Sequence, residues 1–306
     1  MGQGHPGSRT QGLAQVASAN APDPADRISV PDHYRRADLT TAIADAISAA
    51  GKTTHTITAD DLAPLDEFHI GGKAATIDLM RALSPTRGQH ILDVGCGLGG
   101  AARYAAATYG CRVTGIDATP DYIAAGRTIS DWLGVGSGLQ LHEANALELP
   151  FPDATFDLAY MMHVGMNVRE KARLFAEIAR VLRPDARLVL YDVMRTGSGE
   201  PSYPLPWATT AEQCALSTPD VYRAAIESAG FTIEAEQDRR ELALEYFAKQ
   251  RAAVEAGRLR SPIGLHLLMG SRREAQVRHM SEAVARGDIS PMLMTVRLQP
   301  RLLIRH

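Results

Sequence analysis

The sequence predicts an α/β protein built around a mainly parallel β-sheet. From residue 89 onward, short apolar runs alternate with longer stretches of helical periodicity, which is the pattern of βαβ units. The first apolar run leads directly into a glycine-rich segment at residues 95–100, and that segment opens the next helical stretch. Strand, glycine loop and helix in this order are typical of sheets that bind a ligand at the carboxyl ends of their strands.

The elements follow in a regular order. Apolar runs predict strands over residues 90–94, 112–117, 139–144, 156–161, 187–193, 231–236 and 291–298. Apolar side chains at helical spacing predict helices over residues 37–49, 73–83, 99–108, 120–133, 169–182, 219–229, 240–257 and 271–286. Pro184 cannot continue the helix before it, so a turn is expected there.

We divide the chain into five segments. Residues 1–32, rich in Gly, Ala, Pro and Ser, predict a disordered tail, because they lack the apolar side chains that would offset the entropy of ordering. Residues 33–84 predict an N-terminal helical cap, and residues 85–238 predict the core. About 50 residues separate the last two strands, too many for a hairpin loop. We interpret residues 239–290 as a helical insertion that covers the site, and residues 291–306 as the segment whose strand completes the sheet.

Composition restricts the functional class. The 306 residues carry 32 Lys and Arg against 35 Asp and Glu, a formal charge of −3, which argues against nucleic acid and anionic membranes as partners. No apolar run reaches the roughly 18 residues of a membrane span, and the N-terminus lacks a secretory signal. Three cysteines without a CxxC pair are expected to be reduced thiols of a cytoplasmic enzyme. The expected partners are a small molecule and, as a homodimer, a second copy of the chain.

A glycine-rich loop carries the sharpest motif. Gly95, Gly97 and Gly100 fit G-x-G-x-x-G, and Asp117 lies 20 residues after Gly97. Glycines permit a tight turn and let a ligand approach the backbone. The same pattern is found in dinucleotide-binding proteins, so it leaves two cofactors open.

Charge favours one of the two cofactors. A pyrophosphate would lie near Asp93, where anion beside anion is costly. S-adenosylmethionine instead brings an ammonium and a sulfonium, which suit an acid. Asp117 ends the second strand and can accept two hydrogen bonds from ribose hydroxyls, and Asn145 with Ala146 follows the third strand, where an adenine edge could be bound. The predicted cofactor is S-adenosylmethionine.

These motifs resemble those of class I S-adenosylmethionine-dependent methyltransferases. The resemblance rests on ILDVGCGLGG, on GID 20 residues later, and on ANALELPFPDATFDLAYMMHV. The flanking segments LDEFHIGGKAAT, HVGMNVREK, YPLPWA and GLHLLMG are similar to the bacterial sarcosine/dimethylglycine N-methyltransferase group. The resemblance implies a Rossmann-like, seven-stranded mixed sheet whose last strand is antiparallel, helical cap elements, and methyl transfer to a small molecule.

The resemblance also implies roles for individual residues. Its cofactor-binding residues are Asp93, Gly95, Gly97, Gly99, Asp117, Ala118, Asn145 and Ala146. The three glycines would line the methionine half, Ala118 would touch the adenine, and Asn145 with Ala146 would bind its edge. The sequence departs from the family at Asn145, where Asp is common. It also departs at Asp185 and Ala186, which replace glycines of the usual RVLKPGG turn.

Candidates for chemistry follow the later strands. Methyl transfer is an in-line displacement in which alignment dominates, and a hydroxyl acceptor benefits from a base. His163 follows a central strand and is the first candidate for that base, with a locally satisfied histidine as the alternative. Asp192, at the end of the next strand, is the second catalytic candidate. It could pair with a cationic acceptor or merely cap a turn.

Five further residues are candidates for binding the acceptor: His69, Met166, Tyr203, Trp207 and His266. Aromatic rings facing a methylated amine would give cation–π attraction, although Tyr203 and Trp207 could equally pin their loop to the sheet. Structural roles are the alternative for both histidines. No HExxH or CxxC spacing occurs, so no metal site is predicted.

The sequence therefore predicts a methyltransferase acting on a small amine, similar to sarcosine or dimethylglycine. O- or C-methylation of a secondary metabolite is the alternative within the same class. Two other classes remain open, a dinucleotide-dependent oxidoreductase and a binding or regulatory protein that keeps the fold without turnover.

Overall fold

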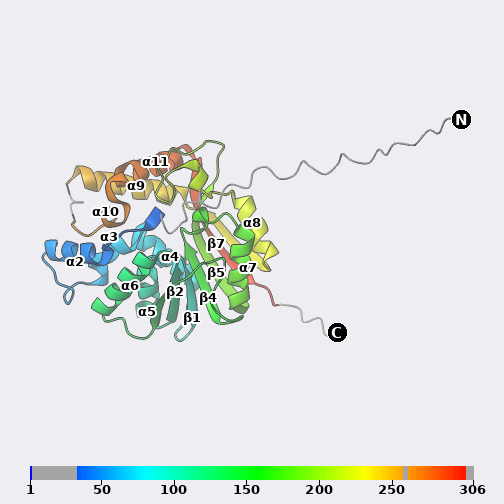
Figure 1. The fold of residues 1–306 in the computed structure, drawn as a ribbon, viewed down its shortest axis with the longest axis horizontal. Coiled ribbons are helices and arrows are strands. Elements are labelled where there is room, and N and C mark those ends of the chain that lie inside the picture. The colour runs from blue at the N-terminus through cyan, green and yellow to red at the C-terminus, as the bar shows by residue number, and fades with distance from the viewer. Residues whose placement is uncertain (2–32, 258–260, 301–306) are drawn as a thin grey trace.

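A computed structural model describes Met1, residues 33–257 and residues 261–300 (Figure 1). The tail predicted for residues 2–32 and residues 301–306 of the terminal segment lie outside the described residues. Seven strands form one sheet, in the order β3-β2-β1-β4-β5-β7-β6. Their bounds are β1 His90–Val94, β2 Arg112–Asp117, β3 Leu139–Glu143, β4 Phe156–Met162, β5 Leu182–Arg195, β6 Phe231–Asp238 and β7 Ile289–Leu298.

The sheet is mixed in the way that was expected. Strands β1 to β5 pair in parallel, whereas β7 is antiparallel to both of its neighbours, β5 and β6. The prediction of a seven-stranded sheet with an antiparallel last strand is confirmed. Because β1, β2, β3 and β4 run in one direction, their carboxyl ends meet along a single edge.

Helices cover both faces of the sheet. The helices are α2 Leu39–Ala49, α3 Ala59–Asp66, α4 Gly72–Leu83, α5 Gly100–Tyr109, α6 Pro120–Trp132, α7 Lys171–Val181, α8 Pro219–Ser228, α9 Arg240–Glu255, α10 His266–Met269 and α11 Arg273–Arg286. Apolar side chains of α7 and α8 pack on one face, and those of α4 and α5 pack on the other. These two layers hold the strands in a fixed register.

Two further apolar clusters lie beyond the edge of the sheet. One joins α2 and α3 to α6 and α10. The other joins α9 and α11 to the loop that contains Trp207 and to the turn at Met166. In Figure 1 the helices α9, α10 and α11 (yellow to orange-red) lie over one end of the sheet, next to α2 and α3 (blue). Segments distant in sequence thus meet at that end.

Helices α3 and α10 and strand β5 differ from the prediction, and α10 is a short helix of four residues within the predicted insertion. Helix α3 was not predicted, although Thr58 and Asp61 form a reciprocal capping box at its start, a recognisable helix signal. Strand β5 begins at Leu182, five residues before the predicted strand, because Leu182 pairs with Phe156 across an irregularity in the ladder. Within that stretch Asp185 adopts a φ of 63°, so the backbone bends while the strand continues. No helix within the described residues is long and apolar enough to cross a membrane.

Candidate functional site

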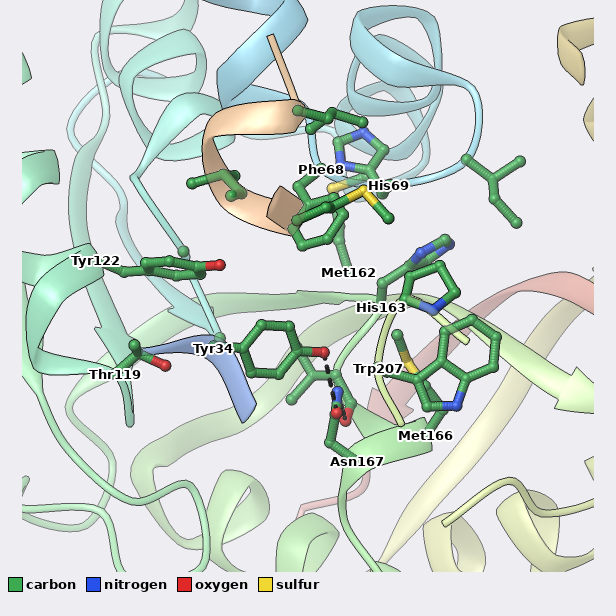
Figure 2. A pocket seen from close by; sticks show the side chains of 18 of the residues that line it. Tyr34, Phe68, His69, Thr119, Tyr122, Met162, His163, Met166, Asn167 and Trp207 are labelled. Atoms are coloured by element: carbon green, nitrogen blue, oxygen red, sulfur yellow. Dashed lines mark hydrogen bonds between the residues drawn. The ribbon is translucent and has the colours of Figure 1, made fainter. Parts of the chain in front are cut away.

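A cavity of about 2140 Å³ opens at the carboxyl ends of β1, β2, β3 and β4. Its floor is formed by residues that follow these strands, and its walls come from the segment between α3 and α4, from α9 to α11, and from Trp207. Figure 2 shows aromatic, histidine and methionine side chains pointing into this space. Ligand sites of parallel sheets lie at this edge.

The glycine loop turns tightly beneath the cavity. The backbone N–H groups of Gly95 and Cys96 both donate to the carbonyl of Ile116, each at 2.8 Å. Gly95 has a φ of +75°, and a Cβ there would lie 2.2 Å from Cγ2 of Val164. Only glycine meets both requirements without strain. The loop therefore packs in close contact with Val164, in the segment that follows β4.

Asp117 is held by the backbone around it. The N–H of Gly97 donates to Oδ2 at 3.0 Å, and the N–H of Thr119 donates to Oδ1 at 2.8 Å. Burial raises the pKa of Asp117, and these hydrogen bonds oppose the rise. A carboxylate has about four acceptor positions, so both oxygens can still accept from a ligand in the cavity.

Asp93 is a buried acid without a cationic partner in the described part of the chain. It is 2% exposed, and the hydroxyl of Tyr160 donates to Oδ2 at 2.7 Å. Burial raises its pKa to about 7, and the charges of Asp117 and Glu67 add to the rise. Asp93 and Asp117 both line the cavity, and Glu67 lies close enough to act on Asp93 through its charge. A positively charged ligand there would stabilise the ionised form of Asp93 against both burial and the charges of the neighbouring acids.

Asn145, Ala146 and Ala118 line the same end of the cavity. The Oδ1 atom of Asn145 accepts from the N–H of Leu147 at 2.9 Å, so this side chain closes its own turn. That bond fixes the amide plane beside the ends of β2 and β3.

His163 lies at the centre of the cavity wall, directly after β4. Its backbone N–H donates to the backbone carbonyl of Tyr191 at 2.8 Å, and its φ is +54°. The Nε2 atom is buried and has no hydrogen-bond partner among the described residues. Burial, together with the nearby ring of His69, lowers the pKa of His163 well below its usual value. The imidazole is therefore neutral at pH 7.

Apolar and aromatic side chains form the opposite wall. Tyr34 donates from its hydroxyl to Oδ1 of Asn167 at 3.1 Å (Figure 2). Phe68 and Met162 lie near His69, while Met166 and Trp207 lie below His163. Sequence reasoning missed Tyr34, which lies in none of the quoted motifs. It also missed Phe68 and Asn167, although both lie in the flanking segments LDEFHIGGKAAT and HVGMNVREK.

Comparisons with known proteins agree with this geometry. Residues 92–190 match a family model described as a methyltransferase domain. The chain is 31% identical over 171 residues to an O-methyltransferase of Pyrenophora dematioidea, which covers 56% of this chain and 64% of that protein. Residues 92–190 therefore form a methyltransferase domain. Across the first relatives the match spans 49–64% of their length.

Solved methyltransferases share the fold. Phosphoethanolamine N-methyltransferase 2 of Haemonchus contortus, solved with S-adenosyl-L-methionine, is similar with a TM-score of 0.68 and 19% identity, covering 91% of this chain and 61% of that one. Geranyl diphosphate C-methyltransferase of Streptomyces coelicolor is similar with a TM-score of 0.59 and 20% identity, covering 73% and 79%. At this identity the likeness concerns the fold.

Most of the predicted site residues reach the cavity of the methyltransferase domain. Those that line it are His69, Asp93, Gly95, Gly97, Asp117, Ala118, Asn145, Ala146, His163, Met166 and Trp207. Gly99, Asp192, Tyr203 and His266 are not among the described residues that line it. Gly99 caps the start of α5 with a φ of 85°, and His266 begins α10.

Asp192 lies behind the cavity wall of the methyltransferase domain. It is fully buried and accepts from the hydroxyl of Tyr222 at 2.7 Å and from the N–H of Val193 at 3.0 Å. A Cβ on Gly165 would lie 2.2 Å from its Oδ2. Asp192 therefore packs against the turn that carries Met166, instead of facing a ligand. No group of three potential metal ligands occurs among the described residues.

Proposed function

We propose that the whole chain is an S-adenosylmethionine-dependent methyltransferase that methylates a hydroxyl group of a small, largely apolar molecule. The observation that carries the proposal is a single cavity, which joins the acids at the ends of β1 and β2 to two neutral histidines and an apolar wall. Its volume exceeds the roughly 300–1,000 Å³ of an ordinary ligand site, so it can hold two ligands together. An O-methyltransferase among the relatives supports the acceptor atom.

The residues present fit S-adenosylmethionine. When bound, this cofactor supplies an electrophilic methyl group on a sulfonium. Asp93 would receive the ammonium, because a buried acid beside two other acids gains most from a cation. Asp117 would hold the ribose hydroxyls, Ala118 would contact the adenine, and Asn145 with Ala146 would bind its edge. Gly95 and Gly97 would border the methionine half.

The remaining lining residues would hold the acceptor. The ring of His163 would border the acceptor, while Met166 and Trp207 would provide apolar contact. We assign residues 33–84 and 239–290 to a cap that excludes water, because water exclusion strengthens alignment and suppresses side reactions. Gly99, Asp192, Tyr203 and His266 would act indirectly, by supporting the elements that line the cavity.

A methylated amine is the second candidate acceptor. Tyr34, Phe68 and Trp207 place aromatic rings on the cavity wall, and aromatic rings attract methylated ammonium groups.

We further propose that the enzyme is cytoplasmic and forms a homodimer. Gel filtration with light scattering would test the dimer.

The proposed function is tested by transfer of label. The protein is incubated with deuterated-methyl S-adenosylmethionine and a panel of phenols, alcohols, sarcosine and dimethylglycine, and products are analysed by mass spectrometry. Label on a hydroxyl supports the proposal, whereas label on sarcosine or dimethylglycine replaces it with the amine. Binding of S-adenosylhomocysteine without labelling of any acceptor would contradict turnover of these classes. Calorimetry with NADH and with S-adenosylhomocysteine separates the oxidoreductase alternative.

A further inference from the structure

Glu67, His69 and Thr76 form a buried cluster between the end of α3 and the first turns of α4. The hydroxyl of Thr76 donates to Oε2 of Glu67 at 2.6 Å. The Nε2 atom of His69 lies 3.3 Å from that same Oε2, 3.2 Å from Oγ1 of Thr76 and 3.1 Å from the carbonyl oxygen of Gly72. The side chains of His69 and Glu67 are each 7% exposed.

These neighbours decide which nitrogen of His69 carries the proton. The carbonyl oxygen of Gly72 can only accept a hydrogen bond, and so can an ionised Glu67. The proton of Thr76 is already donated to Glu67. A bare Nε2 would therefore face three oxygen atoms without a donor, so Nε2 must be protonated. The lone pair of the neutral ring then lies on Nδ1.

The Nδ1 atom of His69 is available to a ligand. Within the described residues nothing forms a hydrogen bond with it, and it is not enclosed by protein atoms, whereas Nε2 of His163 is. His69 lines the cavity, and its ring centroid lies 6.0 Å from that of His163 in an edge-to-face arrangement. Figure 2 shows both rings bordering the same space.

We propose that Nδ1 of His69 is the general base of the reaction and that Glu67 is the positioning residue that fixes its tautomer. The acceptor oxygen forms a bond to the methyl carbon while the carbon–sulfur bond breaks and sulfur keeps the electron pair. The hydroxyl proton moves to Nδ1, and the imidazolium so formed is stabilised by Glu67 through Nε2–H. His163 orients the acceptor. The proposal rests on the proposed O-methylation.

The other charged and titratable groups leave His69 neutral before the reaction. Burial lowers its pKa to about 4, and the hydrogen bond to Gly72 opposes this shift. The cluster's own acid is Glu67, which caps the end of α3. The groups that interact with it or with His69 are Asp66 from α3, Lys73 from α4, Arg103 from α5, Asp93 and Tyr160 from the sheet, His163 after β4 and Tyr246 from α9. A neutral imidazole is the form that a base requires.

Nuclear magnetic resonance tests the tautomer without an identified acceptor. The ¹⁵N shifts of histidine rings are recorded for the wild type bound to S-adenosylhomocysteine and for Glu67→Gln, with Glu245→Gln as the matched control on the exposed side of α9. We expect the Nε2–H form of His69 in the wild type and in the control. In Glu67→Gln, where the amide can donate to Nε2, we expect a shift toward the Nδ1–H form.

Kinetics with the acceptor found by label transfer tests the role. We expect Glu67→Gln to lower kcat by about 10- to 100-fold with little change in KM, and His69→Gln to lower it by at least about 100-fold. Calorimetry with S-adenosylhomocysteine checks that each variant is folded. A wild-type Nδ1–H tautomer, or a larger loss of kcat in His163→Gln than in His69→Gln, would overturn the proposal. Failure of the proposed function is distinguishable, because the wild type would then label no hydroxyl while the tautomer result still stands.

Discussion

Gly95→Ala is expected to destabilise the protein by about 2–5 kcal/mol. A φ of +75° in a residue with a Cβ costs about 1–2 kcal/mol. The new methyl would also lie 2.2 Å from Cγ2 of Val164, and overpacking of this kind costs about 1–3 kcal/mol. Because relief of the clash requires the loop to move, the affinity for S-adenosylhomocysteine is expected to fall as well.

The two contributions separate with two further variants. Gly97→Ala adds a methyl at a φ of +55° with no protein atom within 4 Å, so it carries the backbone strain alone, about 1–2 kcal/mol. In a Val164→Ala background the clash at residue 95 is reduced, and Gly95→Ala should cost about 1–3 kcal/mol less there than in the wild type. Urea denaturation measures stability and calorimetry measures binding. Equal costs of Gly95→Ala in the two backgrounds would refute the close contact between the loop and Val164.

Three further predictions concern the site and its support. Asp117→Ala should weaken S-adenosylhomocysteine binding by about 1–3 kcal/mol, because ribose hydroxyls would lose their acceptor, and unchanged affinity in calorimetry would place the ribose elsewhere. Burial raises the pKa of Asp192 from 3.8 to about 6, so the folded state binds this proton more tightly than the unfolded state. The protonated carboxyl therefore stabilises the fold fully below pH 3.8, and this stabilisation is lost as the pH rises through about 6. Relative to Asp192→Asn, the wild type should therefore lose about 2.4 kcal/mol of stability between pH 4 and pH 7, out of about 3 kcal/mol for the whole shift at about 1.4 kcal/mol per pKa unit. Denaturation curves at both pH values check this, and a constant difference would show that the acid is not perturbed. Trp207→Ala should raise the acceptor KM with little change in cofactor affinity, since its ring lies on the apolar wall; a selective loss of cofactor affinity would speak against this placement.

Much of the fold could be predicted because the strands of the sheet are short apolar runs separated by helices of regular period. The antiparallel position of β7 came from the family resemblance, since alternation in residues 291–298 does not reveal the neighbour of a strand. Helix α3 was missed because its apolar face is only Leu62 and Leu65, too short a pattern to stand out. Its capping box was the available signal.

The cofactor end of the candidate site was easier to predict than the acceptor end. Gly95, Gly97 and Asp117 lie at fixed positions after strands, so their neighbourhood follows from the topology of a parallel sheet. The environment of Asp192 could not be predicted, because strand position alone does not show that Tyr222 and Gly165 enclose the carboxylate. The partners of His69 lie within residues 67–76, and only coordinates reveal that all of them are oxygen atoms.

The insertion of β7 between β5 and β6 has a consequence for synthesis of the protein on the ribosome. Strand β6 is joined to the sheet only through β7 among the described strands, so neither β6 nor the free edge of β5 can be paired until residues 289–298 have emerged. Helices α9 to α11 are translated between β6 and β7, so they cannot pack in their final positions until β7 has joined the sheet. The first strands can pair early, whereas the wall formed by these helices is added at the end. Until then, the apolar residues of β5 are exposed and can associate with other chains, so β5 is the expected binding site for chaperones.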